Sequence, residues 1–174
     1  MSTHCITRFV DCDEYEHWPP SNGMIGTYLR NDTLKQNGMV WGKAREIVCA
    51  WQHHDGGPEG HGATLKAIIE EGIDGDTAEE RVGCFTYMMS EYMSDSYVRL
   101  IPAGTHNIGE HFTYIVYFGS QKRTALQVTK VCFNGTTGTS HRQQLYFGPV
   151  EWFSPDDVEA LAYPPESEED VSGN

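Results

Sequence analysis

FTYIVYFGSQKRTALQVTKVCF, residues 112–133, gives the strongest indication of the fold class in this sequence. Phe112–Phe118 and Ala125–Phe133 are rich in β-branched and aromatic residues, and this composition favours strands. The polar residues Gly119–Arg123 between them are typical of a turn, so we expect the two strands to pair as a hairpin. The sequence therefore predicts a β-sheet in the second half of the chain.

Three more segments are expected to be strands. Thr3–Val10 alternates along its length, Glu46–Gln52 is a short apolar run, and Gln144–Phe147 is a short β-rich stretch. Between the first two of these, Asp11–Lys43 carries acidic residues, prolines and scattered glycines, which indicates a loop followed by an insertion.

The residues after the second strand change to a helical period. His61–Glu71 places its aliphatic residues on one face and is followed by Gly72, a common residue just past a helix end. Asp76, with Glu79 three residues later, is expected to cap a second helix. This second helix carries methionine and aromatic residues at helical spacing, which is typical of a core-facing stripe.

A third, short helix is expected near the end of the chain. Ser154 followed by Pro155 is a helix-start signal, and the helix should run to about Tyr163. We expect residues 1–163 to form one domain and the acidic residues 164–174 to form a flexible tail. The expected fold is α+β, with a mostly antiparallel sheet packed on two helices, a short C-terminal helix and an acidic disordered tail.

Composition limits the classes of partner. The chain has 174 residues with 12 Lys and Arg and 25 Asp and Glu, which gives a net charge of −13 at pH 7. Phosphate binding needs basic residues, so this charge argues against direct binding to nucleic acid or to an anionic membrane and favours a protein with a basic surface. We find no membrane-spanning run and no secretion signal, and we expect the five cysteines to be reduced in the cytoplasm.

The acidic residues are clustered along the chain. One interpretation is solubility and a favourable interaction with helix N-termini; the other is a surface that binds a basic partner. The residues expected to bind such a partner are Glu70, Glu71, Asp74, Asp76, Glu79, Glu80, Asp156, Asp157 and Glu159.

Residues 51–62, WQHHDGGPEGHG, concentrate groups that could carry chemistry. Their spacing matches no zinc motif, and adjacent His53 and His54 would point to opposite faces if both lay in a strand. A phosphate site is disfavoured because the loop lacks lysine and its two acids would repel an anion. We therefore expect no metal site and no cofactor. The possible metal donors considered are His53, His54, Asp55, Glu59 and His61.

The same loop leaves a catalytic and a structural interpretation open. His54 with Asp55 or Glu59 could move protons near neutral pH, and Cys5 is a conceivable nucleophile with His54 as its base. Alternatively, the glycines and the proline shape a tight turn between a strand and a helix. The residues expected to shape this turn are Gly56, Gly57, Pro58 and Gly60.

Two segments together resemble a poorly characterised group of small phage and bacterial proteins. Residues 1–7, MSTHCIT, resemble that group's M-S/G-T-R-C/S-x-I start, and residues 49–62, CAWQHHDGGPEGHG, resemble its Y-x-H-x-D-G-Y-P-E/S-G-x-G strand–loop–helix motif. The group's later Y-x-Y-x-I/V strand is similar to Tyr114–Tyr117. This chain departs from the pattern at His4, where the group has Arg, at Gly57, where it has Tyr, and in its longer segment 11–43.

The resemblance implies a phage accessory gene, active in the cytoplasm of an infected bacterial host. Combined with the charge, it leads us to expect a protein that binds a host protein with a basic surface, most concretely an inhibitor of a host defence complex, as anti-CRISPR proteins are. The alternatives are a small hydrolase or transferase acting on a nucleotide or amide at the glycine-rich loop, and a structural or assembly component of a virion.

Overall fold

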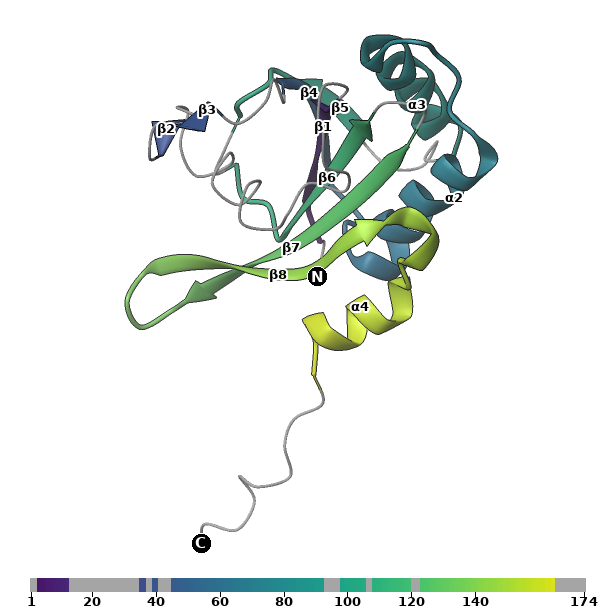
Figure 1. Ribbon diagram of the computed structural model, residues 1–174. Helices are drawn as coiled ribbons and strands as arrows, with labels where there is room; N and C mark the ends of the chain where they lie inside the picture. Colours follow the sequence, from purple (N-terminus) through teal and green to yellow (C-terminus); the bar gives the residue numbers. More distant parts are fainter. Residues whose placement is uncertain are drawn as a thin grey trace, which may run out of the picture.

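A six-stranded sheet with helices on one side makes up most of the described structure (Figure 1). The computed structural model describes residues 3–12, 35–36, 39–40, 45–92, 98–105, 108–119 and 123–164. The strands of the sheet are β1 (Cys5–Cys12), β4 (Arg45–Gln52), β5 (Val98–Ile101), β6 (Phe112–Gly119), β7 (Thr124–Asn134) and β8 (Thr139–Pro149). A separate two-stranded pair consists of β2 (Lys35–Gln36) and β3 (Met39–Val40).

Three α-helices and two short turns of other helix types complete the elements of the described residues. The α-helices are α2 (Ala63–Glu71), α3 (Ala78–Tyr92) and α4 (Pro155–Ala162). A π-helical turn, Pro58–Gly62, leads directly into α2, and a 3-10 turn, Val150–Trp152, follows β8. No helix in the described part of the chain is long and apolar enough to cross a membrane.

The strand order is β5-β4-β1-β6-β7-β8, and β1 lies in the interior of the sheet. Cys5 of β1 pairs with Gln52 of antiparallel β4 and with Phe112 of parallel β6. The other neighbouring strands run antiparallel, including the hairpin of β6 and β7. These pairings confirm the predicted α+β fold with a mostly antiparallel sheet.

The main apolar core lies between the sheet and the helices. Phe9 of β1 points to this side, and its ring lies 5.2 Å from Phe85 of α3 and 6.3 Å from Phe118 of β6. Burying one such side chain contributes roughly 1.5–3 kcal/mol, so this layer anchors the helices on the sheet. The helices add Leu65, Ile68, Val82, Met89, Val158 and Ala162 to the same core.

The start of α3 differs from the prediction by one residue. Thr77, not Asp76, caps the helix: the backbone N–H of Glu80 donates to the Thr77 hydroxyl at 3.2 Å. The Glu80 carboxylate, not that of Glu79, accepts from the N–H groups of Thr77 and Asp76 at 3.1 and 2.9 Å. A capping box is therefore present, but it is shifted because two adjacent residues are both good caps.

Other element boundaries also differ from the sequence prediction by a few residues, and two of these differences change the local structure. The first helix begins at Ala63 rather than His61, because a π-helical turn occupies Pro58–Gly62. β8 begins at Thr139 rather than Gln144, and it extends the β7–β8 hairpin beyond the helix-covered sheet (Figure 1).

Two predictions fall largely outside the described residues. The expected insertion over 11–43 includes the β2–β3 pair, but most of its residues are not described. The expected acidic tail, 164–174, is described only at Pro164.

Candidate functional site

Gly56 fixes the glycine-rich loop against the start of β1. Its N–H donates to the Thr3 carbonyl at 2.9 Å, and its own carbonyl accepts from the Tyr114 hydroxyl at 2.9 Å. A Cβ at this position would lie 2.8 Å from the backbone nitrogen of Cys5. Only glycine fits this approach, since the atoms that would clash belong to the backbone.

The next residues form a compact turn into α2. Asp55 has φ of 53°, and its carbonyl accepts from the His61 N–H at 2.9 Å. A Cβ on Gly60 would lie only 2.6 Å from that same carbonyl oxygen, whereas one on Gly57 would meet the flexible Glu159 side chain at 3.3 Å. The loop geometry thus accounts for Gly56 and Gly60 without any ligand, and Pro58 lies buried in the first turn.

His61 is separated from the other histidines of the loop. Its side chain is fully buried, with Nε2 at 2.5 Å from the Thr7 hydroxyl and its ring 4.9 Å from the Tyr114 ring. Burial lowers the pKa of His61 to about 3. His61 is therefore a neutral core residue that joins the helical turn to β1.

The predicted catalytic residues do not come together. Cys5 lies buried on the helix-facing side of β1, and burial raises the pKa of its thiol well above the usual value. His54, Asp55 and Glu59 are exposed, and the Glu59 N–H donates to the Glu159 carboxylate at 3.4 Å on the α4 side. A buried, protonated thiol is a poor nucleophile, so Cys5 does not suit the role of nucleophile.

A different set of histidines gathers at one end of the sheet. His53 follows β4, His4 precedes β1 and His111 precedes β6, so the strand register places the three side by side. The rings of His4 and His53 are 4.5 Å apart, and those of His4 and His111 are 5.4 Å apart. His54 joins them through a 4.3 Å ring contact with His53. We call His4, His53, His54 and His111 the histidine row.

Sequence reasoning missed His4 and His111. His4 donates its backbone N–H to Nδ1 of His111 at 3.1 Å, and the His111 N–H donates to the His4 carbonyl at 2.9 Å. The two residues meet only because β1 and β6 pair in parallel. The expectation that His53 and His54 point apart applied to a strand, but β4 ends at Gln52 and both lie in the following bend.

His4 favours the neutral form of its imidazole. Burial lowers the pKa of His4, with further lowering from the charges of His53, His111 and His54. A backbone hydrogen bond at Gly109 acts in the opposite direction. Within the described residues, no three His, Cys, Asp or Glu side chains are already arranged to hold a metal ion.

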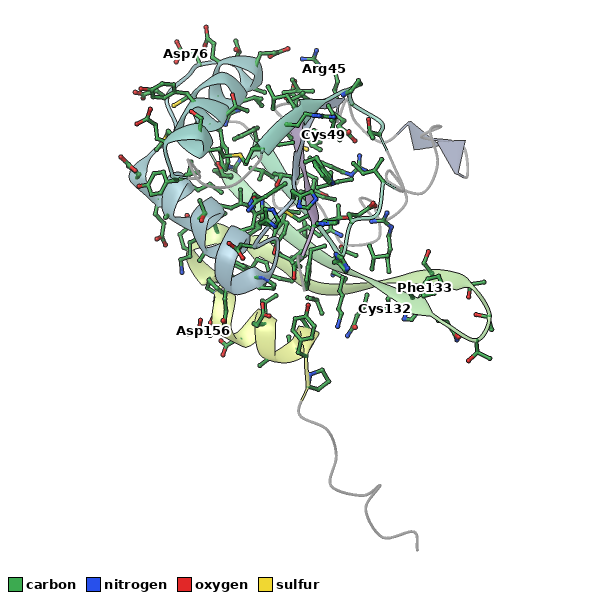
Figure 2. The ribbon with its side chains drawn as sticks, turned by 180° about the vertical axis from the view of Figure 1, so that it is seen from behind. Arg45, Cys49, Asp76, Cys132, Phe133 and Asp156 are labelled. Carbon is green, nitrogen blue, oxygen red and sulfur yellow. The ribbon has the colours of Figure 1, made fainter. Side chains whose placement is uncertain are left out.

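The predicted acidic surface consists of two separate groups (Figure 2). Figure 2 places Asp76, just before α3, and Asp156, in the first turn of α4, at opposite ends of the helical side. In the α4 group, Glu159 is held against the glycine-rich loop through the Glu59 N–H. The nine predicted residues therefore do not form one continuous patch.

Most acids around the α2–α3 connection have local partners. Glu79 pairs with Arg45, Glu70 lies 3.7 Å from Lys66, and Glu71 accepts from the Tyr92 hydroxyl. Asp74 and Asp76 have no side-chain hydrogen bond or ion pair within the described part of the chain. These two carboxylates are therefore available to bind a partner.

A hollow of about 600 Å³ lies beside this connection. The guanidinium of Arg81 in its wall is buried, donates to the Gly119 carbonyl at 2.9 Å and lies 5.1 Å from the centre of the Phe118 ring. Arg81 is thus directed inward. The hollow is lined by Ile69, Glu71, Gly72, Ile73, Asp74, Arg81, Arg123, Thr124, Pro149 and Glu151.

Comparisons with known proteins gave no match. The chain matches no protein-family model, no curated protein and no solved structure at a significant level. The resemblance carried by residues 1–7 and 49–62 stays a prediction.

Proposed function

We propose that this chain is a protein-binding domain whose α2–α3 side engages a basic surface on a partner. The hollow carries the proposal: Glu71, Asp74 and Glu151 line it, and the exposed Asp76 lies nearby in sequence. Its volume of about 600 Å³ is ample for a lysine or arginine side chain of the partner. We infer that such a side chain enters the hollow and pairs with these carboxylates.

The charges around the hollow support this direction of recognition. Three carboxylates and two arginines line the hollow. Arg81 is already bound to the Gly119 carbonyl, so it competes little for the acids at the rim, and Arg123 is exposed. Complementary charge raises the association rate and selects the partner more than it raises affinity. With a net charge of −13, the whole chain adds a long-range attraction to a basic protein.

The partner that best fits this chemistry is a protein with a basic, nucleic-acid-binding groove. Together with the resemblance to phage proteins, this favours an inhibitor of a host defence complex, acting as anti-CRISPR proteins do. The hydrolase or transferase alternative lacks comparable support because its proposed nucleophile, Cys5, is buried. Nothing in the described residues favours a virion component.

The test is a pull-down from host lysate with the full chain at low and high salt, followed by binding measurements with the identified partner. We expect one stoichiometric partner that is lost at high salt, because the pairing is electrostatic. The triple variant Asp74→Asn, Asp76→Asn and Glu151→Gln removes three negative charges in and beside the hollow. It should bind the partner at least about tenfold more weakly, a loss of roughly 1.4 kcal/mol in binding free energy.

Asp156→Asn with Asp157→Asn is the matched control, since it removes two acids at the other end of the helical side. This control should bind almost as tightly as the wild type. A partner that stays bound at high salt, or that binds the triple variant and the wild type equally, would refute the proposal.

A further inference from the structure

The protruding end of the β7–β8 hairpin carries an exposed aromatic residue (Figure 2). Phe133, near the end of β7, has 71% of its surface exposed, and its cross-strand partner is the small residue Ser140. We propose that residues 131–141, the hairpin tip, form a second contact with a protein partner, in which Phe133 enters an apolar pocket on that partner. The inference rests on the proposed function, because the partner is the one that the acidic hollow binds.

The hairpin tip is held in shape by its own hydrogen bonds. The Asn134 side-chain oxygen accepts from the N–H groups of Thr136 and Thr137 at 2.9 and 3.1 Å. The Asn134 carbonyl accepts from the Gly138 N–H at 2.9 Å, and Gly138 has φ of 68°, which glycine adopts without strain. A tip that is already shaped in this way loses little conformational entropy on binding, so more of the burial of Phe133 contributes to affinity.

The base of the hairpin is attached to the rest of the domain through both strands. Arg142 of β8 donates to the Glu110 carboxylate at 2.9 Å. Lys130 of β7 donates to the Ala162 carbonyl at the end of α4, and its ammonium group lies 4.2 Å from the centre of the Tyr163 ring. These contacts fix the direction in which the hairpin projects.

The lack of charge on the hairpin tip decides the kind of partner. Residues 131–141 contain no Lys, Arg, Asp or Glu, in a chain whose net charge is −13. Phosphate contacts need Lys or Arg, and the adjacent cations Lys130 and Arg142 already bind groups of this domain, so the tip is unsuited to nucleic acid. An uncharged surface around an aromatic ring can be buried against a protein without desolvating a charge, and aromatic residues are enriched in protein interfaces.

The same two strands connect the hairpin tip to the acidic hollow. Thr124 at the start of β7 and Pro149 at the end of β8 line the hollow, and the tip lies at the other end of both strands. The 11 residues of β7, at about 3.3 Å each, separate the two contacts by roughly 30 Å. A partner with a long groove can meet both contacts, and two linked contacts bind more tightly than either does alone.

The test measures binding of the full-length Phe133→Ser chain to the purified partner, at several salt concentrations below the one that releases it. We expect binding at least about tenfold weaker than that of the wild type. The salt dependence should stay the same, because the substitution removes no charge. The triple variant Asp74→Asn, Asp76→Asn and Glu151→Gln should instead lose much of the salt dependence. Leu161→Ala is the matched control: it removes an exposed apolar side chain of α4 and should bind like the wild type.

A photo-crosslinking benzophenone amino acid in place of Phe133 locates the pocket on the partner. We expect cross-links to apolar residues of the partner protein, at a place different from those formed by the same group in place of Asp76. Equal binding by Phe133→Ser and the wild type, or a cross-link from position 133 to nucleic acid, would overturn this inference and leave the acidic hollow as the binding site. Equal binding by the triple variant would refute the proposed function instead, and a pull-down without a partner would refute both.

Discussion

The two faces of the central sheet are both buried, but they are stabilised by different chemistry. On the helix-covered face, Phe9 stacks on Phe118, and Phe85 meets both rings edge-on in an apolar layer. The opposite face is mixed: Arg8 and Gln127 are almost inaccessible, with 1% and 5% of their surface exposed, and a smaller apolar cluster lies on the same face. This cluster consists of Val10, Cys12, Ile115, Tyr117 and Ala125. An apolar layer tolerates changes that preserve volume, whereas the buried polar groups of the mixed face depend on each partner of each bond.

The mixed face contains a group of interactions around Arg8. Its Nη1 donates to both carboxylate oxygens of Glu46 at 3.0 and 3.2 Å, and its Nη2 donates to the Thr105 carbonyl at 2.5 Å. Glu46 also accepts from the Gly104 N–H at 2.8 Å and from the Cys49 thiol at 2.7 Å. This group ties β1 and β4 to the segment that precedes β6.

Arg8→Met should produce the largest loss of stability. It leaves the Glu46 carboxylate buried without its cation, which costs about 3–5 kcal/mol of unfolding free energy. Urea denaturation measures the change. The double variant Arg8→Met with Glu46→Leu should recover much of it, since apolar replacements of a buried pair are often neutral. A loss below about 1 kcal/mol in the single variant would mean that water reaches the Arg8–Glu46 pair, so that it behaves like an ion pair on the protein surface.

Gly56→Ala tests how tightly the helical layer is joined to the sheet. The new Cβ would lie 2.8 Å from backbone atoms of Thr3, His4 and Cys5, so the loop or β1 must move. We expect a loss of about 2–4 kcal/mol, from overpacking and from the weakened bond to Thr3. Gly83→Ala on α3 is the matched control; it meets open space and should stabilise by about 0.5–1 kcal/mol. Equal thermal shifts for both variants would contradict this assignment.

His61 is a polar group on the apolar face, and its effect depends on pH. The pKa of His61 is about 3 when folded, against about 6.5 in an unfolded chain. Below pH 6.5 the unfolded state takes up a proton that the folded state does not, so stability falls by up to about 1.4 kcal/mol per pH unit down to pH 3. At pH 5 this amounts to about 2 kcal/mol.

The comparison of wild type with His61→Gln isolates this effect. Glutamine can keep a hydrogen bond to Thr7 but does not titrate, while all other acidic and basic groups are shared. Unfolding free energies of the two chains, measured from pH 7 to pH 5, should therefore diverge, with the wild type losing more. If the unfolding free energies of the two chains change in parallel with pH, His61 takes up its proton as readily in the folded state as in the unfolded state.

Local sequence signals predicted most of the fold. β6 and β7 were identified by their β-branched and aromatic residues, and α4 by its Ser154-Pro155 start. The first half of β8 was missed because TSHRQQ lies in the protruding hairpin, where no core imposes an apolar alternation. The parallel pairing of β1 with β6 was also missed, since nothing local in either strand specifies a partner about a hundred residues away.

The candidate sites also depended on contacts between residues far apart in the sequence. The glycine-rich loop could be recognised as a strand-to-helix turn, but the separation of His61 from His53 follows from the π-helical turn, which has no clear sequence signal. His4 and His111 became neighbours only through the β1–β6 register. The acidic residues were visible in sequence, but their division into two groups required the positions of α3 and α4.

Phe133→Ser should have the smallest effect, because Phe133 belongs to neither face. It lies on the protruding part of the β7–β8 hairpin opposite Ser140, with 71% of its surface exposed (Figure 2). We expect a change within about 0.5 kcal/mol in urea denaturation and an unchanged mass by light scattering. A large loss of stability, or a smaller oligomer than the wild type, would show that this hairpin packs against another copy of the chain. The sheet would then have a third buried environment, and the contrast between its two faces would describe only part of what stabilises it.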